Sequence, residues 1–133
     1  MTRFNSVVFH PGNKTADVGA GLVWDDAYAA LEPFNVTVVG GRISGIGVAG
    51  FALGGGQSPV SSAFFRHLYL PIGYSYLTNE FGLAMDNIVA LEVALPDGQV
   101  LTINKQSNAD LFSSVKVSLT VRSAACFLMR ISL

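Results

Sequence analysis

The chain has 133 residues and a net charge of −1; half of its residues are hydrophobic and only 13% are charged. This length accommodates a single domain, and the lack of any lysine or arginine cluster argues against nucleic acid, which requires a basic face. The single cysteine, Cys126, excludes an internal disulfide and a cysteine-rich metal site. Neither His10 nor His67 sits in a metal-ligand spacing, so we expect no metal site.

The N-terminal residues MTRFNSVVFHPG have no long apolar core, so we expect no signal peptide in this chain. We expect no membrane partner either, because no segment offers the ~20 apolar residues that cross a bilayer. Localisation stays open, since a leader of the complete protein would precede this start. Two glycosylation sequons, at Asn13 and Asn35, suit a secreted protein, but such tripeptides often arise by chance.

The first part of the chain predicts two strands and a helix. Residues 6–11 and 15–21 read as short strands joined by the turn signal GNK. The helical spacing i, i+3, i+4, i+7 follows in Trp24, Ala27, Tyr28 and Leu31. Asp25 and Asp26 lie where the helix dipole favours acids, and Pro33 stops the helix. We interpret the two acids as helix-start charges and not as a catalytic pair.

A glycine-rich segment follows the apolar run NVTVV, which we expect to be a strand over 35–39. Residues 40–56, GGRISGIGVAGFALGGG, hold eight of the 14 glycines. Gly45, Gly47 and Gly50 spell G-x-G-x-x-G, the pattern of a Rossmann dinucleotide site. That site needs a longer helix than residues 54–56 allow and an acid about 20 positions on, which is missing. An NAD-binding Rossmann domain is therefore the weaker alternative to a loop whose amides face a phosphate.

The later part predicts a hairpin and a helix. Two apolar runs in NIVALEVALPDGQVLTIN are joined by the turn signal Pro96-Asp97-Gly98. Only Glu92 interrupts the first run, so we expect that strand to be buried on both faces. The segment SNADLFSSV opens a helix, with Ser107 and Asp110 in capping-box spacing. Strands and short helices in this irregular order predict an α+β fold with a mixed sheet.

Two long stretches carry a family resemblance: ADVGAGLVWDDAYAALEPFNVTVVGGRISGIGVAGFALGGG and GYSYLTNEFGLAMDNIVALEVALPDGQVLTINKQSNADLF. Together they resemble the FAD-binding (PCMH-type) domain of FAD-linked oxidoreductases, the family of vanillyl-alcohol oxidase, p-cresol methylhydroxylase and berberine bridge enzyme. The fungal berberine-bridge-like members are the most similar. The resemblance covers about residues 7–116, apart from 57–72, and the glycine loop, the GYSYLTNEFGLAMDNI block and the LPDG hairpin occur in the family's order.

The resemblance implies FAD as the cofactor and a set of residues that contact it. The glycine loop would line the pyrophosphate, two later glycines and GYS would continue that wall, and MDNI would run beside the cofactor. The residues so implied are Gly41, Ser44, Gly45, Gly47, Val48, Gly50, Gly55, Gly56, Tyr74, Ser75, Asp86 and Asn87. Tight strand packing is the alternative role for the glycines, and a turn before a buried strand is the alternative for Asp86 and Asn87.

The chain also departs from the family pattern. The family's first phosphate loop, with a histidine that can bond to flavin, would lie upstream, and neither His10 nor His67 matches it. No cysteine stands in the glycine loop for a second flavin link. The substrate domain with the catalytic residues is not in this sequence, so we assign no catalytic residue. We expect this chain alone to bind FAD weakly or not at all and to be inactive.

Two stretches break the resemblance, residues 57–72 and 117–133. We expect an insertion at 57–72 within a partial FAD-binding domain over 1–116, followed by a divergent tail. Val117-Ser118 can be encoded by GTA-AGT, a common start of an intron, so we hypothesise that both stretches are translated intron. A true loop insertion and a divergent C-terminus are the competing account.

The function that follows is that of a fragment of an FAD-linked oxidoreductase. By resemblance, the complete enzyme would oxidise an alcohol, sugar or related small molecule by hydride transfer to flavin, with O2 as electron acceptor. The alternatives are a catalytically inert truncated product and, less favoured, the NAD-binding domain.

Overall fold

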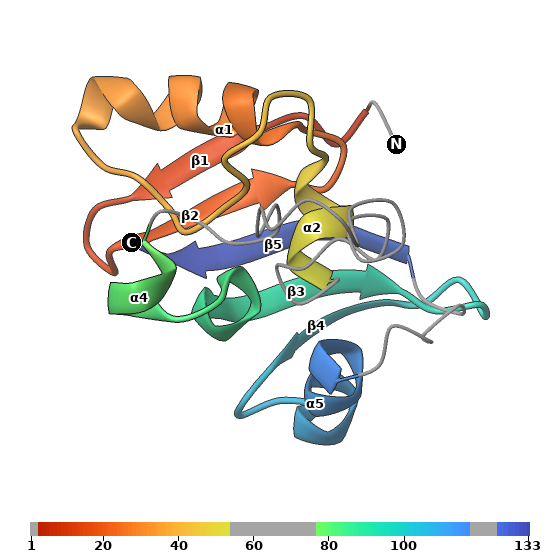
Figure 1. The fold of residues 1–133 in the computed structure, drawn as a ribbon. Helices are drawn as coiled ribbons and strands as arrows, with labels where there is room; N and C mark the ends of the chain where they lie inside the picture. The colour runs from red at the N-terminus through yellow and green to blue at the C-terminus, as the bar shows by residue number, and fades with distance from the viewer. Residues whose placement is uncertain (1–2, 54–76, 118–124) are drawn as a thin grey trace, which may run out of the picture.

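The computed structural model describes residues 3–53, 77–117 and 125–133. Figure 1 shows a single twisted sheet with short helices against it. The sheet has the order β1-β2-β5-β3-β4, and every neighbouring pair is antiparallel. The strands are β1 (Val7–His10), β2 (Thr15–Gly19), β3 (Ile88–Ala94), β4 (Val100–Asn104) and β5 (Ala125–Ser132). The helices are α1 (Trp24–Leu31), α2 (Val48–Leu53), α4 (Thr78–Phe81), α5 (Ala109–Val117), and the 3-10 helices η1 (Glu32–Phe34) and η2 (Ala84–Asn87).

Both predicted strand pairs form. In the second hairpin, β3 pairs with β4, and Gly98 takes φ +85° in the turn between them. The amide of Gln99 donates to the Asp97 carboxylate over 3.0 Å, which is the local hydrogen bonding that makes aspartate a turn former. The expected burial of β3 on both faces holds only in part, because Val89 is 43% exposed.

The α+β class is confirmed, but the expectation of a mixed sheet is wrong for the described strands. β2 and β3 run in the same direction, and they would form a parallel pair if they were neighbours. β5 lies between them and runs against both, so each contact becomes antiparallel. The order of the elements along the sequence does not show that β5, the last strand in the chain, lies between β2 and β3.

β5 joins the two hairpins into one sheet. Residues 117–133 break the family resemblance and are expected to be a divergent tail, but within them Ala125–Ser132 pairs with β2 on one side and β3 on the other. Its side chains Met129 and Ile131 are fully buried. Whether this strand derives from an intron stays a prediction that transcript reads would test.

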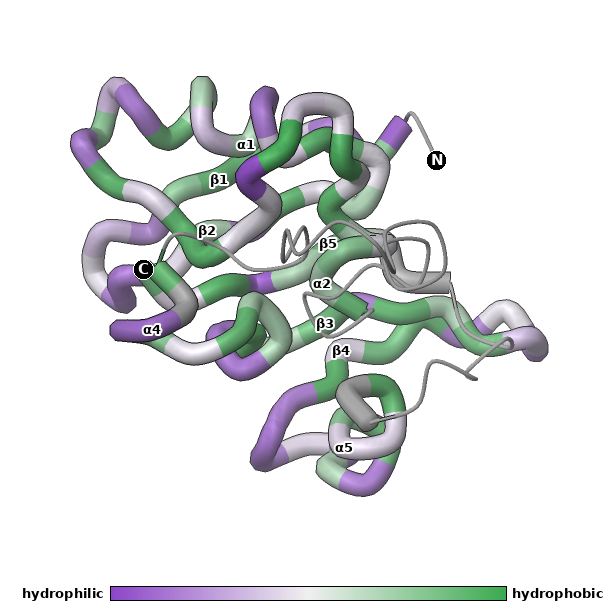
Figure 2. Tube along the Cα trace, viewed as in Figure 1, coloured by the Kyte–Doolittle hydropathy of each residue, from purple (hydrophilic) through white to green (hydrophobic). Residues whose placement is uncertain are grey.

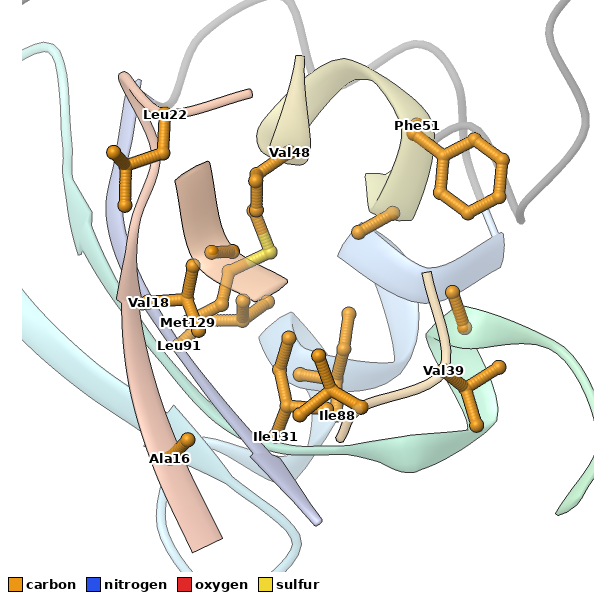
Figure 3. Packing of buried hydrophobic residues seen from close by; sticks show 14 of the residues in the cluster. Ala16, Val18, Leu22, Val39, Val48, Phe51, Ile88, Leu91, Met129 and Ile131 are labelled. Carbon is orange, nitrogen blue, oxygen red and sulfur yellow. The ribbon is translucent and has the colours of Figure 1, made fainter. Parts of the chain in front are cut away.

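The core lies on one face of the sheet, where Val18, Met129, Leu91 and Ile103 form a row across four strands. Figure 3 shows that Val48 and Phe51 of α2 join this cluster. Trp24 and Leu31 of α1 belong to the same cluster and are fully buried, as the helical spacing predicts. Burying each large apolar side chain stabilises the fold by roughly 1.5–3 kcal/mol. Figure 2 shows the hydrophobic residues concentrated on the strands and the hydrophilic ones in the connections.

The opposite face of the sheet carries a polar cluster. The Arg130 guanidinium of β5 donates to both carboxylate oxygens of Asp17 on β2, over 2.6 and 2.7 Å, and His10 of β1 lies 3.0 Å from the same carboxylate. Burial raises the pKa of the Asp17 carboxyl, but the hydrogen bonds and charges of Arg130 and His10 outweigh it and leave that pKa below its ordinary value. The cluster therefore ties β1, β2 and β5 together.

Three further expectations concern the run over 35–39, the start of the helix after Ser107 and membrane-spanning helices. The run over 35–39 is not a strand; Val38 and Val39 are buried, but they pack against the core without joining the sheet. The helix after Ser107 begins at Ala109, so Asn108 and not Ser107 precedes its first residue. In the part of the chain that the structure describes, no helix is long and apolar enough to cross a bilayer.

Candidate cofactor-binding loop

The glycine loop runs from the buried Val39 to the start of α2, and backbone contacts fix the end that leads into α2. An isolated bridge joins Val23 to Gly47. Within it, the Trp24 amide donates to the Ile46 carbonyl over 3.0 Å, and the Val48 amide donates to the Leu22 carbonyl over 2.9 Å. The loop over residues 40–47 is therefore attached to the chain just before α1, which positions it beside that helix.

The first half of the loop packs against an aromatic ring. A Cβ added to Gly40 would overlap the benzene part of the Trp24 indole, and a Cβ added to Gly41 would lie 2.8 Å from Trp24 Cδ1. The ring cannot give way easily, because Trp24 is fully buried and contacts the rings of Tyr28 and Phe51. Packing against Trp24 therefore explains the small size of Gly41; its contact with a cofactor stays a prediction.

Two side chains of α1, those of Tyr28 and Asp25, form hydrogen bonds to the loop. The Tyr28 hydroxyl donates to the Gly41 carbonyl over 2.9 Å. One carboxylate oxygen of Asp25 accepts from the Ser44 hydroxyl over 2.9 Å and from the Gly45 amide over 2.8 Å. These two hydrogen bonds, that of the Gly45 amide first, hold the pKa of Asp25 below its ordinary value. Burial, with a smaller effect of the Asp25 charge, raises the pKa of Tyr28 to about 12.

The second half of the loop is open. Gly45 and Gly47 of the loop and Gly50 in α2 are exposed. Among the described residues, chain neighbours and the backbone of α2 apart, no heavy atom lies within 4 Å of the position that a Cβ would take on any of them. Gly45 also has φ +81°, which other residues rarely adopt. Val48 differs, because its side chain is fully buried and its amide is already bonded to Leu22. The open glycines are thus the part of the predicted set that a ligand can approach closely.

Asp86 and Asn87 lie in η2, directly before β3. The Asp86 carboxylate accepts from the Leu83 amide over 3.0 Å, and the Asn87 side-chain amide donates to the carbonyls of Phe81 and Leu83, each over 2.9 Å. These bonds close the turn that leads into the buried strand, which is the alternative role considered for the pair. Contact with a cofactor stays a prediction for both residues.

The structure brings the glycine loop and η2 to one side of the sheet, because α2 contacts η2. Two hollows meet at Asn87: an apolar one of about 280 Å³ lined in part by Val39, Phe81 and Leu133, and a polar one of about 230 Å³ lined in part by Asp86 and Lys105. Four predicted residues, Gly55, Gly56, Tyr74 and Ser75, lie outside the described residues, as does the expected insertion over 57–72.

The Rossmann alternative does not fit this geometry. A Rossmann site needs a strand that leads into the glycines within a parallel sheet. The described run over 35–39 is not a strand, and all the described strand pairs are antiparallel. A helix does begin at Val48 after Gly47, but it ends at Leu53. The G-x-G-x-x-G spacing here belongs to a different fold.

No protein-family model matches the chain. Among curated proteins, the chain is 36% identical over 110 residues to an uncharacterised FAD-linked oxidoreductase of Arthroderma benhamiae, covering 83% of this chain and 19% of that protein. It is 35% identical over 116 residues to the FAD-dependent monooxygenase tpcD of Cochliobolus heterostrophus, covering 87% and 19%. The chain belongs to the FAD-linked oxidoreductase family.

The solved structures agree with this assignment. BBE-like 1 of Physcomitrella patens superimposes with a TM-score of 0.81 and 28% identity, covering 98% of this chain and 25% of that one. Its fold is therefore that of part of a berberine-bridge-like FAD-binding domain. The chain spans about a fifth of the length of the curated relatives given above.

Sequence reasoning missed two residues that shape the loop, Asp25 and Tyr28. It interpreted Asp25 as a helix-start charge and Tyr28 as part of an apolar helix face. Both descriptions hold, because Asp25 lies in the first turn of α1 and Tyr28 is half-buried beside Trp24. Their hydrogen bonds to residues 13 to 20 positions away have no signal in local spacing.

Proposed function

We propose that the glycine loop of this chain forms one wall of an FAD site in an FAD-linked oxidoreductase. The observation that carries the proposal is the open side of Gly45, Gly47 and Gly50, where no side chain of the described residues keeps a ligand from the backbone. Its support is the relatives' dependence on FAD, stated in their names. The α2–η2 contact adds Asp86 and Asn87 to the same side of the sheet.

We propose also that the complete enzyme oxidises an alcohol, sugar or related small molecule, with the flavin as hydride acceptor and O2 as the electron acceptor that reoxidises it. FAD would supply that redox chemistry when bound, and the residues of this chain would position it. The chain alone would oxidise no substrate, because it spans about a fifth of the relatives' length and we assign it no catalytic residue.

The test is a titration of the purified chain with FAD, following the quenching of flavin fluorescence. Gly50→Leu places a large side chain on the open face, while Gly12→Leu makes the same change at a glycine of the β1–β2 turn that also has open space around it. Of the two outcomes expected for the chain alone, weak binding or none, the proposal requires the first: weak, saturable quenching that Gly50→Leu abolishes and Gly12→Leu preserves. Quenching that does not saturate, or that Gly50→Leu leaves unchanged, would overturn the proposal.

A further inference from the structure

The Asp25 carboxylate accepts hydrogen bonds from two donors of the loop, the Ser44 hydroxyl and the Gly45 amide. A backbone amide at a left-handed glycine next to a serine hydroxyl is a donor pair that suits an oxyanion. In this structure the pair donates to Asp25 Oδ2, from Ser44 Oγ over 2.9 Å and from the Gly45 amide over 2.8 Å. An acid of the chain itself thus occupies that donor pair.

Building on the proposed FAD site, we propose that Asp25 is its positioning residue: the carboxylate holds the Ser44–Gly45 turn and keeps the cofactor's phosphates away from it. A phosphate at the Gly45 amide would stand within a few ångströms of Asp25, where like charges repel. Ser44 and Gly45 would then contact only uncharged parts of the cofactor, and the pyrophosphate would lie elsewhere along the wall.

A groove beside Asp25 adds a second negative charge, that of Glu32, to this side of the loop. A groove of about 600 Å³ runs along α1 beside it, and Asp25 and Glu32 are its charged groups, with no lysine or arginine among the described lining residues. Tyr28 also lines this groove, and its hydroxyl stays neutral to high pH because its pKa is raised to about 12. Negative charge on this side of the loop directs an anionic group away from α1.

Asp25 can hold the turn without being part of the core. Its neighbour Trp24 is fully buried and fixes the start of α1 beneath Gly40 and Gly41, so the position of the carboxylate is set by the helix. Asp25 itself is exposed, and its charge therefore remains in place at neutral pH. The loop is anchored by Trp24 and the bridge at Gly47, and Asp25 adds a negative charge beside Ser44 and Gly45.

Two substitutions separate the hydrogen bond from the charge. Asp25→Asn keeps a side-chain oxygen for the Gly45 amide but removes the charge, and Asp25→Ala removes both. Asp26→Asn is the matched control, because it removes the same charge from the next residue of the helix, which has no hydrogen bond to the loop. Each variant of the 133-residue chain is titrated with inorganic pyrophosphate and with FAD, and the Gly45 amide is followed by NMR.

We expect Asp25→Asn to tighten pyrophosphate and FAD binding by about threefold or more relative to Asp26→Asn, a change that a unit charge at 5–6 Å produces in water. We expect the Gly45 amide resonance to titrate with the Asp25 carboxyl in the wild type and in Asp26→Asn, and not in Asp25→Asn. Hydrogen exchange at Gly45 should be at least tenfold faster in Asp25→Ala than in Asp25→Asn.

The outcomes separate this proposal from the FAD site itself. If FAD binds no variant but pyrophosphate binds Asp25→Asn more tightly than Asp26→Asn, the FAD site fails and the exclusion of phosphate stands. Equal anion affinities of the two variants, or no anion binding by any variant, would overturn the exclusion. If the resonance of the Gly45 amide does not change as the Asp25 carboxyl titrates, the proposal that Asp25 positions the Ser44–Gly45 turn would be overturned.

Discussion

The two halves of the glycine loop use the same residue type for opposite reasons. At Gly40 and Gly41, the missing side chain makes room for the buried Trp24 ring. At Gly45, Gly47 and Gly50, the missing side chain leaves an exposed backbone that no side chain of the described residues covers. The first half is therefore a packing element of the fold, and the second half is the surface on which we place the cofactor.

This difference shows that a glycine count does not locate a ligand site. Both halves read alike in the sequence, as glycines after an apolar run. Only the position of Trp24, 16 residues before Gly40, distinguishes them, and that position follows from the helix and the bridge at Gly47. Substitutions in each half should accordingly separate stability from binding.

The largest effect is expected for Gly40→Ala. The new methyl group would overlap the Trp24 ring, which is fully buried, and overpacking of this kind costs up to about 3 kcal/mol. Urea unfolding followed by far-UV circular dichroism measures the loss, with Gly12→Ala as the control at an open glycine. A loss below about 1 kcal/mol would show that the first half is not packed as described.

The second prediction tests whether Trp24 causes that loss. Trp24→Phe removes part of the ring that faces Gly40 and should cost about 2 kcal/mol by itself, through lost packing. In the Trp24→Phe background, we expect Gly40→Ala to cost about 1 kcal/mol in place of about 3, because residues in contact are not additive. Equal costs in both backgrounds would assign the strain to another neighbour.

The third prediction concerns the hydrogen bond from Tyr28 to the Gly41 carbonyl. Tyr28→Phe removes it and should cost about 1 kcal/mol at pH 8. The wild type should also lose stability above pH 10, because the hydroxyl, with a pKa near 10 in the unfolded chain and about 12 in the fold, ionises first when unfolded. The variant lacks this group, so the difference between the two should shrink from pH 8 to pH 10.5. A constant difference over that range would contradict the assignment.

Some of the fold could be predicted from the sequence because its signals are local. The hairpin of β3 and β4 follows from Pro96-Asp97-Gly98 between two apolar runs, and α1 follows from the spacing of Trp24, Ala27 and Leu31. The family could be recognised because its motifs lie in continuous stretches. These signals need no knowledge of partners distant in the chain.

The elements that were missed depend on distant partners. Residues 128–132 alternate between half-buried and buried, but the strand is stabilised by β2 and β3, and the pair Asp17–Arg130 is 113 residues apart in the sequence. The run over 35–39 has the β-branched residues of a strand, but it pairs with none of the described strands. At the site, the glycine spacing of the sequence predicts a loop that a ligand can approach, and Gly45, Gly47 and Gly50 are exposed in the structure. The hydrogen bonds of Asp25 to Ser44 and Gly45 form only because α1 packs beside the loop, and no local sequence pattern indicates that contact.

The smallest effect on stability is expected in the open half. Gly47→Ala adds a methyl group where no atom of the described residues other than its chain neighbours lies within 4 Å, so the free energy of unfolding should change by less than about 0.5 kcal/mol. If the open half binds FAD, the same methyl group keeps the cofactor from the backbone, and the loss of about one close polar contact weakens binding by roughly tenfold. Gly12→Ala is the control for both measurements. Unchanged flavin-fluorescence quenching in Gly47→Ala would move the cofactor off this half of the loop and leave both halves as structural elements.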